Sequence, residues 1–314
     1  MLAWLPYDDL AAAEQAIGPL PEGVECEPFP RADQPPRRVD EVGFFVVPYL
    51  SGSSPLERID EMSSLQVVQT QTAGYEEILP LVPDAVTLCN ATGVHDASTA
   101  EMTLALILAN GRHLDMYARQ QTEGRWKGKW GNSLADKRVL IFGYGNIGAA
   151  IERRLTGFEV ASITKVASRA RDDIHGTDEL PDLLPTADIV ILIAPHTAQT
   201  DKIINAESLA LMPDGALLVN VARGKLVDTE ALLAETTSGR LRAALDVTDP
   251  EPLPADHPLW TAPGVTISPH VGGASTAFTP RTNKLIGDQL RRWVAGEQLI
   301  NVVRAGSASD GGGA

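Results

Sequence analysis

The sequence predicts an α/β fold with two doubly wound, parallel sheets. Three observations support this prediction. Between residues 136 and 275, short apolar segments alternate with helical stretches, a rhythm that is typical of parallel sheets. A glycine-rich turn joins the first of these apolar segments to a helix. Before residue 95, shorter apolar runs separated by turn residues indicate a second, smaller α/β unit.

Length and composition limit the class of protein. The 314 residues are enough for two domains of ordinary size. No apolar run reaches the roughly 18 residues of a membrane helix, and the N-terminal segment lacks the pattern of a secretory signal. Two cysteines, Cys26 and Cys89, are too few for a disulfide framework, so we expect a cytoplasmic protein. A formal net charge of −15 argues against a nucleic-acid partner.

The first region, residues 1–95, contains two apolar runs that we predict as buried strands, at residues 44–50 and 65–71. Turn residues follow the first run, and Pro55 is placed to open a helix that runs through Glu61. Residues 97–120 are predicted as one long helix that leaves this region. Ser98 is its expected N-cap, with Glu101 in the capping-box position.

The middle region predicts six strands with helices between most of them. The strands are expected at residues 138–143, 161–167, 189–194, 216–221, 243–247 and 265–268. A final helix is predicted at residues 277–295, with Gly296 as its stop signal. A short apolar piece, residues 299–303, precedes a low-complexity tail, 305–314, that is expected to be disordered.

The glycine-rich turn predicts a dinucleotide site. Gly143, Gly145 and Gly148 follow a predicted strand directly and open a helix, and this context makes a common pattern informative. The first glycine permits a tight turn, the second lets the backbone approach a pyrophosphate, and the third permits close helix–strand packing. Free N–H groups at the start of the helix, around Asn146 and Ile147, suit phosphate oxygens.

The end of the second strand of this region indicates which cofactor is preferred. An NAD site usually carries Asp or Glu there to bind the ribose hydroxyls. Here Ser168 occupies that position, and Arg169 and Arg171 follow. Serine and arginine can bind a 2′-phosphate that a carboxylate would repel. We therefore predict a preference for NADP(H), while use of NAD(H) through Asp172 or Asp173 stays open.

Candidate reactive side chains follow three later strands. Arg223 comes directly after Val221 and Ala222 at the end of a buried strand. Its planar guanidinium can pair with a carboxylate through two hydrogen bonds. In parallel sheets, ligands bind beyond the carboxyl ends of the strands. Arg223 is therefore a candidate for binding an acidic substrate.

The next two motifs supply an acid and a histidine. Asp246 ends one strand, and Glu251 follows five residues later between two prolines. His270 ends the last strand, just before a Gly-Gly pair. Histidine is the side chain best suited to carry a proton near neutral pH. The order of Arg, Glu and His at successive strand ends is more informative than any one of these residues.

These motifs together resemble a known family. FGYGNIG, VNVARGKLVD, ALDVTDPEPLP and SPHVGGAS occur in the order found in the D-isomer-specific 2-hydroxyacid dehydrogenases, and TAGYEE and TGVHDASTAE match more loosely. The resemblance covers roughly residues 44–304 and is greatest to the glyoxylate/hydroxypyruvate reductases. It implies two Rossmann-like domains, in which a cofactor domain (96–276) is inserted into a discontinuous substrate domain (1–95 and 277–304).

The resemblance also implies roles for individual residues. His270 would exchange a proton with the keto oxygen, Glu251 would hold its imidazole in the protonated form, and Arg223 would bind the substrate carboxylate and keto oxygen. Asp246 would bond the nicotinamide carboxamide. The implied cofactor contacts are Gly143, Gly145, Asn146, Ile147, Gly148, Ser168, Arg169, Arg171, Pro195, Val221, Ala222 and Asp246. The implied substrate contacts are Arg223, the backbone amides of Ala73 and Gly74, and a pocket lined by Tyr49 and Leu50. No metal is expected.

Several alternatives stay open at this stage. Trp126 and Trp130 lie in the segment that forms a dimer arm in the family, which implies a homodimer made through the cofactor domain. A dinucleotide-sensing module of the same fold could keep all three reactive residues. A phosphoglycerate-type enzyme would need extra cations, for which Arg58 is the nearby candidate. A formate-type dehydrogenase carries Gln beside its histidine, and Glu251 argues against it.

Overall fold

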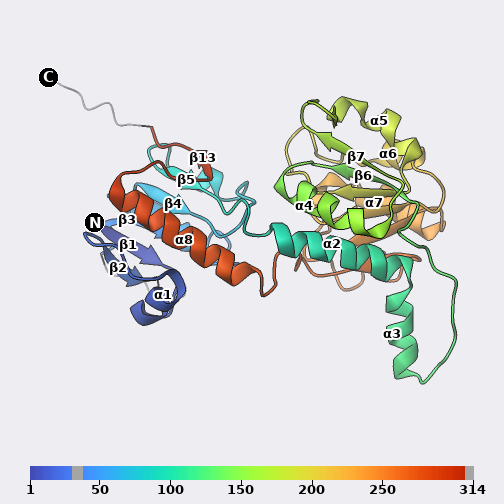
Figure 1. Ribbon diagram of the computed structural model, residues 1–314, viewed down its shortest axis with the longest axis horizontal. Coiled ribbons are helices and arrows are strands. Elements are labelled where there is room, and N and C mark those ends of the chain that lie inside the picture. The colour runs from blue at the N-terminus through green and yellow to red at the C-terminus, as the bar shows by residue number, and fades with distance from the viewer. Residues whose placement is uncertain (30–37, 308–314) are drawn as a thin grey trace. The chain divides into compact units, whose positions relative to one another are not determined.

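The computed structural model describes residues 1–29 and 38–307, which fold into two compact units (Figure 1). Met1–His95 and the described residues from Thr276 onward form the first unit, and Asp96–Ser275 form the second. The second unit is therefore inserted in sequence into the first. No helix among the described residues is both long and apolar enough to cross a lipid bilayer.

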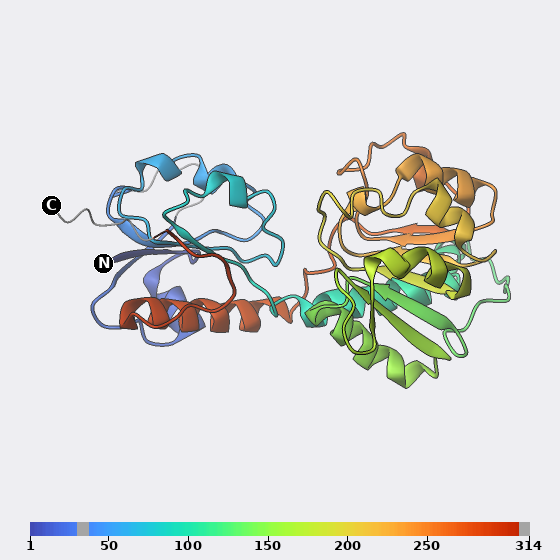
Figure 2. The ribbon, with the colours of Figure 1, turned by 90° about the horizontal axis from the view of Figure 1, so that it is seen from above.

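The first unit has a six-stranded sheet in the order β13-β5-β4-β3-β1-β2, in which only β13 runs antiparallel to its neighbour. Its strands are β1 (Leu2–Leu5), β2 (Glu25–Pro28), β3 (Val42–Val46), β4 (Val67–Gln69), β5 (Thr87–Cys89) and β13 (Val302–Arg304). Helices α1 (Leu10–Ile17) and α8 (Phe278–Ala295) cover one face, as Figure 2 shows. Short 3-10 helices at Ser54–Leu56, Ile59–Glu61 and Leu79–Leu81 lie over the other face.

Successive side chains along each strand point to opposite faces of this sheet, and both faces are buried. Phe44 packs toward α8 and lies 5.3 Å, centroid to centroid, from Trp293. Its neighbour Phe45 points to the opposite face and meets Trp4 edge-on. Because successive strand residues point to opposite faces, an apolar run such as 42–47 can fill two cores at once.

The second unit has a seven-stranded sheet in the order β12-β11-β10-β9-β6-β7-β8, and every pair of neighbours is parallel. Its strands are β6 (Arg138–Phe142), β7 (Ser162–Ala167), β8 (Ile174–Gly176), β9 (Ile189–Leu192), β10 (Leu217–Asn220), β11 (Arg242–Leu245) and β12 (Val265–Ile267). Its helices are α2 (Asp96–Gly111), α3 (Leu114–Thr122), α4 (Asn146–Leu155), α5 (Leu180–Leu183), α6 (Ala206–Leu211) and α7 (Thr229–Thr237).

Helices cover both faces of this sheet, so the predicted doubly wound arrangement is confirmed. Ile189 and Ile191 of β9 pack in the core that contains α2 and α4. Val190 and Leu192 of the same strand pack in the opposite core, with side chains from α5, α6 and α7. The six strands predicted for this region are all present, and β8 is an addition that the sequence analysis did not predict.

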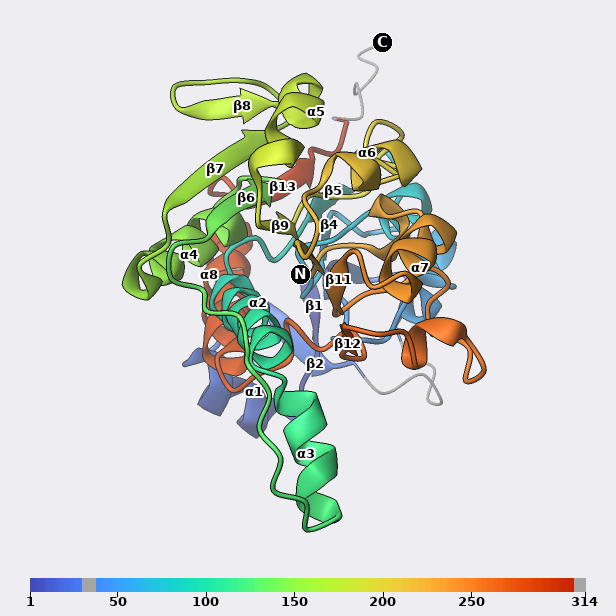
Figure 3. The same cartoon turned by 90° about the vertical axis from the view of Figure 1, so that its right-hand side faces the viewer.

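The long helix predicted at residues 97–120 is wrong in two respects. It is broken after Gly111, where His113 takes a left-handed backbone with φ 58°, and α3 then begins at Leu114. The helix also starts at Asp96, so Ser98 lies inside it and its hydroxyl bonds the Ser275 hydroxyl at 2.6 Å. Figures 1 and 3 show α3 and the segment after it projecting from the rest of the second unit.

One smaller expectation also differs from the structure. The helix predicted at residues 55–61 is two separate 3-10 turns. At the start of the predicted tail, the Gly306 N–H donates to Thr87 Oγ1 at 3.0 Å and the Ser307 N–H donates to the Asp84 carbonyl. The last seven residues of the predicted tail, 308–314, lie outside the described residues. The last helix ends at Gly296, in the left-handed region with φ 67°, as the sequence predicts.

Candidate active site

One edge of the seven-stranded sheet gathers the predicted cofactor and reactive residues of the second unit. All seven strands are parallel, so their carboxyl ends meet at this edge. The segments that leave the strands here carry, in chain order, the glycine turn after β6, Ser168 after β7, Pro195 after β9, Arg223 after β10, Asp246 after β11 and His270 after β12.

The glycine turn has the geometry that a dinucleotide requires. Gly143 has φ 103°, and a Cβ there would lie 2.3 Å from the Ala194 backbone nitrogen, so only glycine fits. A Cβ on Gly148 would lie 3.3 Å from the Gly143 carbonyl oxygen, which reflects close helix–strand packing. A Cβ on Gly145 would meet nothing within 4 Å. The backbone at Gly145 therefore faces open space, where a ligand can approach it.

Helix α4 begins directly after this turn. Its first bond runs from the Ala149 N–H to the Gly145 carbonyl at 2.9 Å. The N–H groups of Asn146, Ile147 and Gly148 belong to the first turn of the helix, where no intrahelical acceptor is available. Free N–H groups and the positive end of the helix dipole stabilise bound phosphates. These residues fit the pyrophosphate of a nicotinamide dinucleotide.

The segment after β7 forms a tight, exposed turn. Arg171 and Ile174 exchange backbone hydrogen bonds of 2.9 and 2.8 Å, and Asp172 at the tip has φ 48°. The Arg171 guanidinium donates to the Tyr144 carbonyl of the glycine turn at 3.3 Å. Asp173 contacts Lys165, which holds the pKa of its carboxyl below the usual value. Asp173 is thus already engaged by a cation.

Arg223 stands on a loop that is held at both ends. The buried side chain of Asn220 accepts from the Ala222 N–H at 3.1 Å and donates to the Arg223 carbonyl at 2.8 Å. A Cβ on Gly224 would lie only 1.9 Å from the Thr248 carbonyl oxygen. This close approach ties the loop after β10 to the loop that leads from Asp246 to Glu251.

His270 and Glu251 form a direct pair. The imidazole Nδ1 contacts Glu251 Oε1 within hydrogen-bonding distance. With Nδ1 occupied, Nε2 is the ring nitrogen left to exchange a proton with a ligand. His270 also has a left-handed backbone, with φ 52°. That conformation is uncommon for a residue with a side chain and needs support from its surroundings.

Asp246 provides that support. Its side chain is 2% exposed, and Oδ1 accepts from Ser268 Oγ at 2.5 Å and from the Val271 N–H at 3.0 Å. Oδ2 accepts from the Gly272 N–H at 2.7 Å. The Asp246 carbonyl also accepts from the His270 N–H at 2.7 Å. One buried carboxylate therefore holds the turn that carries the histidine.

The predicted substrate contacts of the first unit also follow strand ends. The Asn90 amide donates to the Ala73 carbonyl at 2.7 Å, and Thr72 Oγ1 donates to the Gly74 carbonyl at 2.7 Å. These bonds restrain the loop at its carbonyl oxygens. Tyr49 stacks on Phe278 with ring centroids 4.2 Å apart, and Leu50 beside it is 76% exposed with φ 58°.

Sequence reasoning missed three residues that hold the loops of the site in place. Asn220, Ser268 and Gly272 hold the Arg223 loop or the His270 turn, as described above. A buried asparagine at the end of an apolar strand was a usable signal for the first. Nothing in the local sequence indicated that Ser268 and Gly272 bond Asp246, which is 22 and 26 residues away in the chain.

A parallel sheet that carries a glycine-rich dinucleotide turn, an arginine and a carboxylate-paired histidine at one edge defines a class of nicotinamide-dependent oxidoreductases. The comparison with known proteins identifies the family. Residues 104–272, more than half of the chain, match the model for the D-isomer specific 2-hydroxyacid dehydrogenase, NAD binding domain. The chain belongs to this family of NAD(P)-dependent enzymes, as the resemblance predicts.

Individual relatives agree with this assignment. The chain is 33% identical over 265 residues to a glyoxylate reductase of Thermofilum pendens, covering 78% of this chain and 77% of that protein. It superimposes on an NADPH-dependent glyoxylate/hydroxypyruvate reductase of Sinorhizobium meliloti, solved with NADP and malonate, with a TM-score of 0.78 at 27% identity. That match covers 96% of each chain. A D-isomer specific 2-hydroxyacid dehydrogenase of Xanthobacter autotrophicus, solved with NADPH and MES, also gives a TM-score of 0.78, at 28% identity over 96% of this chain and 98% of that one.

Replacing Asp246 with Asn should destabilise the second unit by about 1–3 kcal/mol, because an amide NH₂ would face backbone N–H donors without an acceptor. Denaturant unfolding measures this loss, and hydrogen exchange should quicken at the Val271 and Gly272 amides. Asp256→Asn is the matched control, because Asp256 is exposed and has no hydrogen bond to the described residues. Equal stability of the two variants would contradict the supporting role of Asp246.

Proposed function

We propose that this enzyme reduces a small 2-keto acid, glyoxylate or hydroxypyruvate, to the 2-hydroxy acid with NADPH. The observation that carries the proposal is the Glu251–His270 pair at the sheet edge that also holds Arg223 and the glycine turn. The names of the relatives, glyoxylate reductase and glyoxylate/hydroxypyruvate reductase, support the choice of substrate.

In the proposed mechanism, the Arg223 guanidinium pairs with the substrate carboxylate and polarises the keto group. His270 Nε2 donates a proton to the keto oxygen as it gains electrons. Glu251 holds Nδ1 and orients the ring. The bound nicotinamide supplies the hydride. The left-handed turn supported by Asp246 keeps the imidazole in place, so little reorganisation is needed during the reaction.

The first unit is proposed to complete substrate binding. The carbonyl oxygens of Ala73 and Gly74 are bonded to Asn90 and Thr72. Among the described residues, the N–H groups of Ala73 and Gly74 have no hydrogen-bond acceptor, which suits a carboxylate ligand. Tyr49 and Leu50 are proposed to line the pocket beside this loop.

One alternative substrate class fits less well. A phosphorylated substrate would need an available cation in the first unit, and Arg58 was the candidate. Arg58 instead makes a two-pronged pair with Glu61, with distances of 2.8 Å from Nε and 2.5 Å from Nη2. This pair lowers the pKa of the Glu61 carboxyl and satisfies the guanidinium locally. The arrangement favours an unphosphorylated acid over a phosphoglycerate-type substrate.

The cofactor preference is proposed to be NADP(H). Ser168 and Arg169 are exposed at the end of β7, and Arg169 has no acid partner among the described residues. Of the two carboxylates that could instead serve NAD(H), Asp173 is engaged by Lys165, whereas Asp172 is exposed at the tip of the turn. The Ser168 hydroxyl and the Arg169 guanidinium at the strand end are the groups that would favour a 2′-phosphate.

The enzyme is also proposed to form a homodimer through the cofactor domain. Trp126 and Trp130 are fully exposed, in the segment that follows the projecting helix α3. Two such side chains close together in sequence are typical anchors of a protein interface. A second copy of this chain is the partner that the family resemblance implies.

Turnover tests the main proposal. Purified enzyme with NADPH should consume glyoxylate or hydroxypyruvate, and His270→Ala should lower kcat by about 10²–10⁴-fold, the usual contribution of a positioned proton donor. Absorbance at the NADPH maximum follows the reaction. NADPH binding by His270→Ala, measured by fluorescence, should stay near the wild-type value. If the wild type binds NADPH but consumes none with any of a panel of 2-keto acids, a dinucleotide-sensing module is the better assignment.

Cofactor choice is tested at the proposed phosphate contact. Arg169→Ala should weaken NADPH binding by about 10–100-fold, the worth of a charge-assisted hydrogen bond, and should leave NADH binding nearly unchanged. Steady-state KM values for both cofactors measure this. Arg153→Ala, which removes an exposed arginine at the far end of α4, is the control and should change neither value. Equal losses for NADPH and NADH would refute the phosphate assignment.

Oligomeric state tests the proposed dimer. Light scattering should give twice the monomer mass for the wild type, and Trp126→Ala combined with Trp130→Ala should shift it toward monomer, because the interface loses its apolar anchors. Trp260→Ala changes a partly exposed tryptophan outside that segment and should keep the dimer. A monomeric wild type, or a double variant that dimerises as well as the wild type, would contradict the proposal.

A further inference from the structure

A cavity of about 180 Å³ lies at the amino ends of the central strands of the seven-stranded sheet. The candidate active site is at the carboxyl ends of the same strands. Arg242 and Leu217, the first residues of β11 and β10, line it, as does Ile189 at the start of β9. The end of α2 and residues 132–134, where the chain returns from the projecting segment, complete the wall. The charged side chains of the lining are Lys137, Asp188, Asp214 and Arg242. The proposed reaction uses none of these residues.

Arg242 is a cation without a counter-ion. Its guanidinium donates to Asn110 Oδ1 at 3.0 Å and to the Gly215 carbonyl at 3.1 and 3.3 Å. These acceptors are all neutral, and among the described residues no carboxylate pairs with Arg242. Burial lowers the pKa of this guanidinium. An arginine carries five N–H donors, so two remain for another acceptor.

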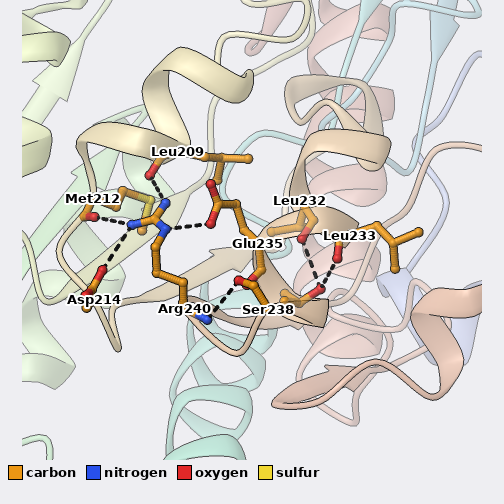
Figure 4. A network of polar contacts seen from close by, with 9 residues as sticks. Leu209, Met212, Asp214, Leu232, Leu233, Glu235, Ser238 and Arg240 are labelled. Carbon is orange, nitrogen blue, oxygen red and sulfur yellow. Dashed lines mark hydrogen bonds and ion pairs between the residues drawn. The ribbon is translucent and has the colours of Figure 1, made fainter.

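The carboxylates in the cavity wall are already matched by other arginines. Asp188 accepts two bonds from the Arg138 guanidinium, at 2.9 and 3.0 Å, and this pair lowers the pKa of its carboxyl. Figure 4 shows the second case, in which Arg240 reaches Asp214 at 3.6 Å and also donates to Glu235. Arg240 and Arg242 are two residues apart, yet only Arg240 has acid partners.

Lys137 adds a second positive charge to the lining. No carboxylate of the described residues lies within ion-pair distance of its ammonium group, although its field also contributes to lowering the pKa of Asp188. The cavity is thus lined by two cations without ion-pair partners and by two carboxylates that are engaged elsewhere. The lining itself carries two positive and two negative charges, and among the described residues only the two negative ones have ion-pair partners.

We propose that this cavity, named here the strand-base cavity, binds a small dianionic oxyanion, a phosphate group or a dicarboxylate, through Arg242 and Lys137. Its volume equals roughly six water molecules at 30 Å³ each, enough for such a group. The free N–H groups of a guanidinium match two oxygens of a phosphate or carboxylate. The site is separate from the pyrophosphate turn, which lies at the other edge of the same sheet.

Calorimetric titration of the full chain, saturated with NADPH, tests whether the strand-base cavity binds a small dianion. Saturation keeps the probe from the cofactor's own phosphate contacts. Inorganic phosphate and malonate are the two probes, and they distinguish a phosphate from a dicarboxylate ligand; chloride at equal ionic strength is the reference. One or both probes should bind at one site, with a Kd on the order of 1 mM. Arg242→Gln should weaken binding at least tenfold.

Two further variants keep the result decisive. The Lys137 side chain lines the cavity and makes no hydrogen bond to the described residues, so Lys137→Gln should weaken binding severalfold even if Arg242→Gln proves unstable. Arg153→Gln removes the same charge from an exposed site on α4 and should bind like the wild type. Absence of binding by both probes, or equal binding by the wild type, Arg242→Gln and Lys137→Gln, overturns the proposal. Since the readout is binding of the probe, the outcome does not depend on whether the enzyme reduces a keto acid.

Discussion

The parallel register of the seven-stranded sheet is the constraint on which the rest of the site depends. Each strand of the second unit starts at one edge and ends at the other. Every loop that follows a strand is therefore delivered to the same edge, whatever its distance in the chain. The glycine turn after residue 142 and the histidine at 270 are far apart in sequence. The sheet order β12-β11-β10-β9-β6 nevertheless places their strands in one continuous row.

A second constraint acts within that edge, where backbone approaches are closer than side chains allow. Gly143 lies against Ala194, Gly224 against Thr248 and Gly272 against Asp246, and a Cβ at any of these positions would come within 2.8 Å of a neighbouring atom. The glycines therefore bring the loops into contact, and buried polar groups then lock them together. Asp246 and Asn220 do this by bonding backbone N–H groups of the loops that carry His270 and Arg223. Rigidity of this kind is what a reaction between positioned groups requires.

The charged residues at the two ends of the strands differ in how they are paired. At the carboxyl ends, His270 is paired with Glu251, whereas Arg169 and Arg171 are exposed. At the amino edge, most charges are paired, as in Arg138–Asp188 and Arg240–Glu235. Arg242 and Lys137 are the exceptions there among the described residues, and the neutral hydrogen-bond acceptors of Arg242 do not compensate its charge.

The sequence by itself determined the fold class, six of the seven strands of the second unit and the family, whereas β1, β2 and β5 of the first unit were not predicted. Alternating apolar segments and glycine spacing are local signals, and Arg223, Glu251 and His270 each stand in a recognisable motif. The sequence did not predict the break after Gly111, the short β8 or the antiparallel β13, because short elements depend on contacts with their neighbours. The tertiary structure alone decided that Asp246 supports the His270 turn and that Arg242 is left without an acid. Both depend on which backbone atoms lie beside a buried charge, and residues distant in the sequence supply those atoms.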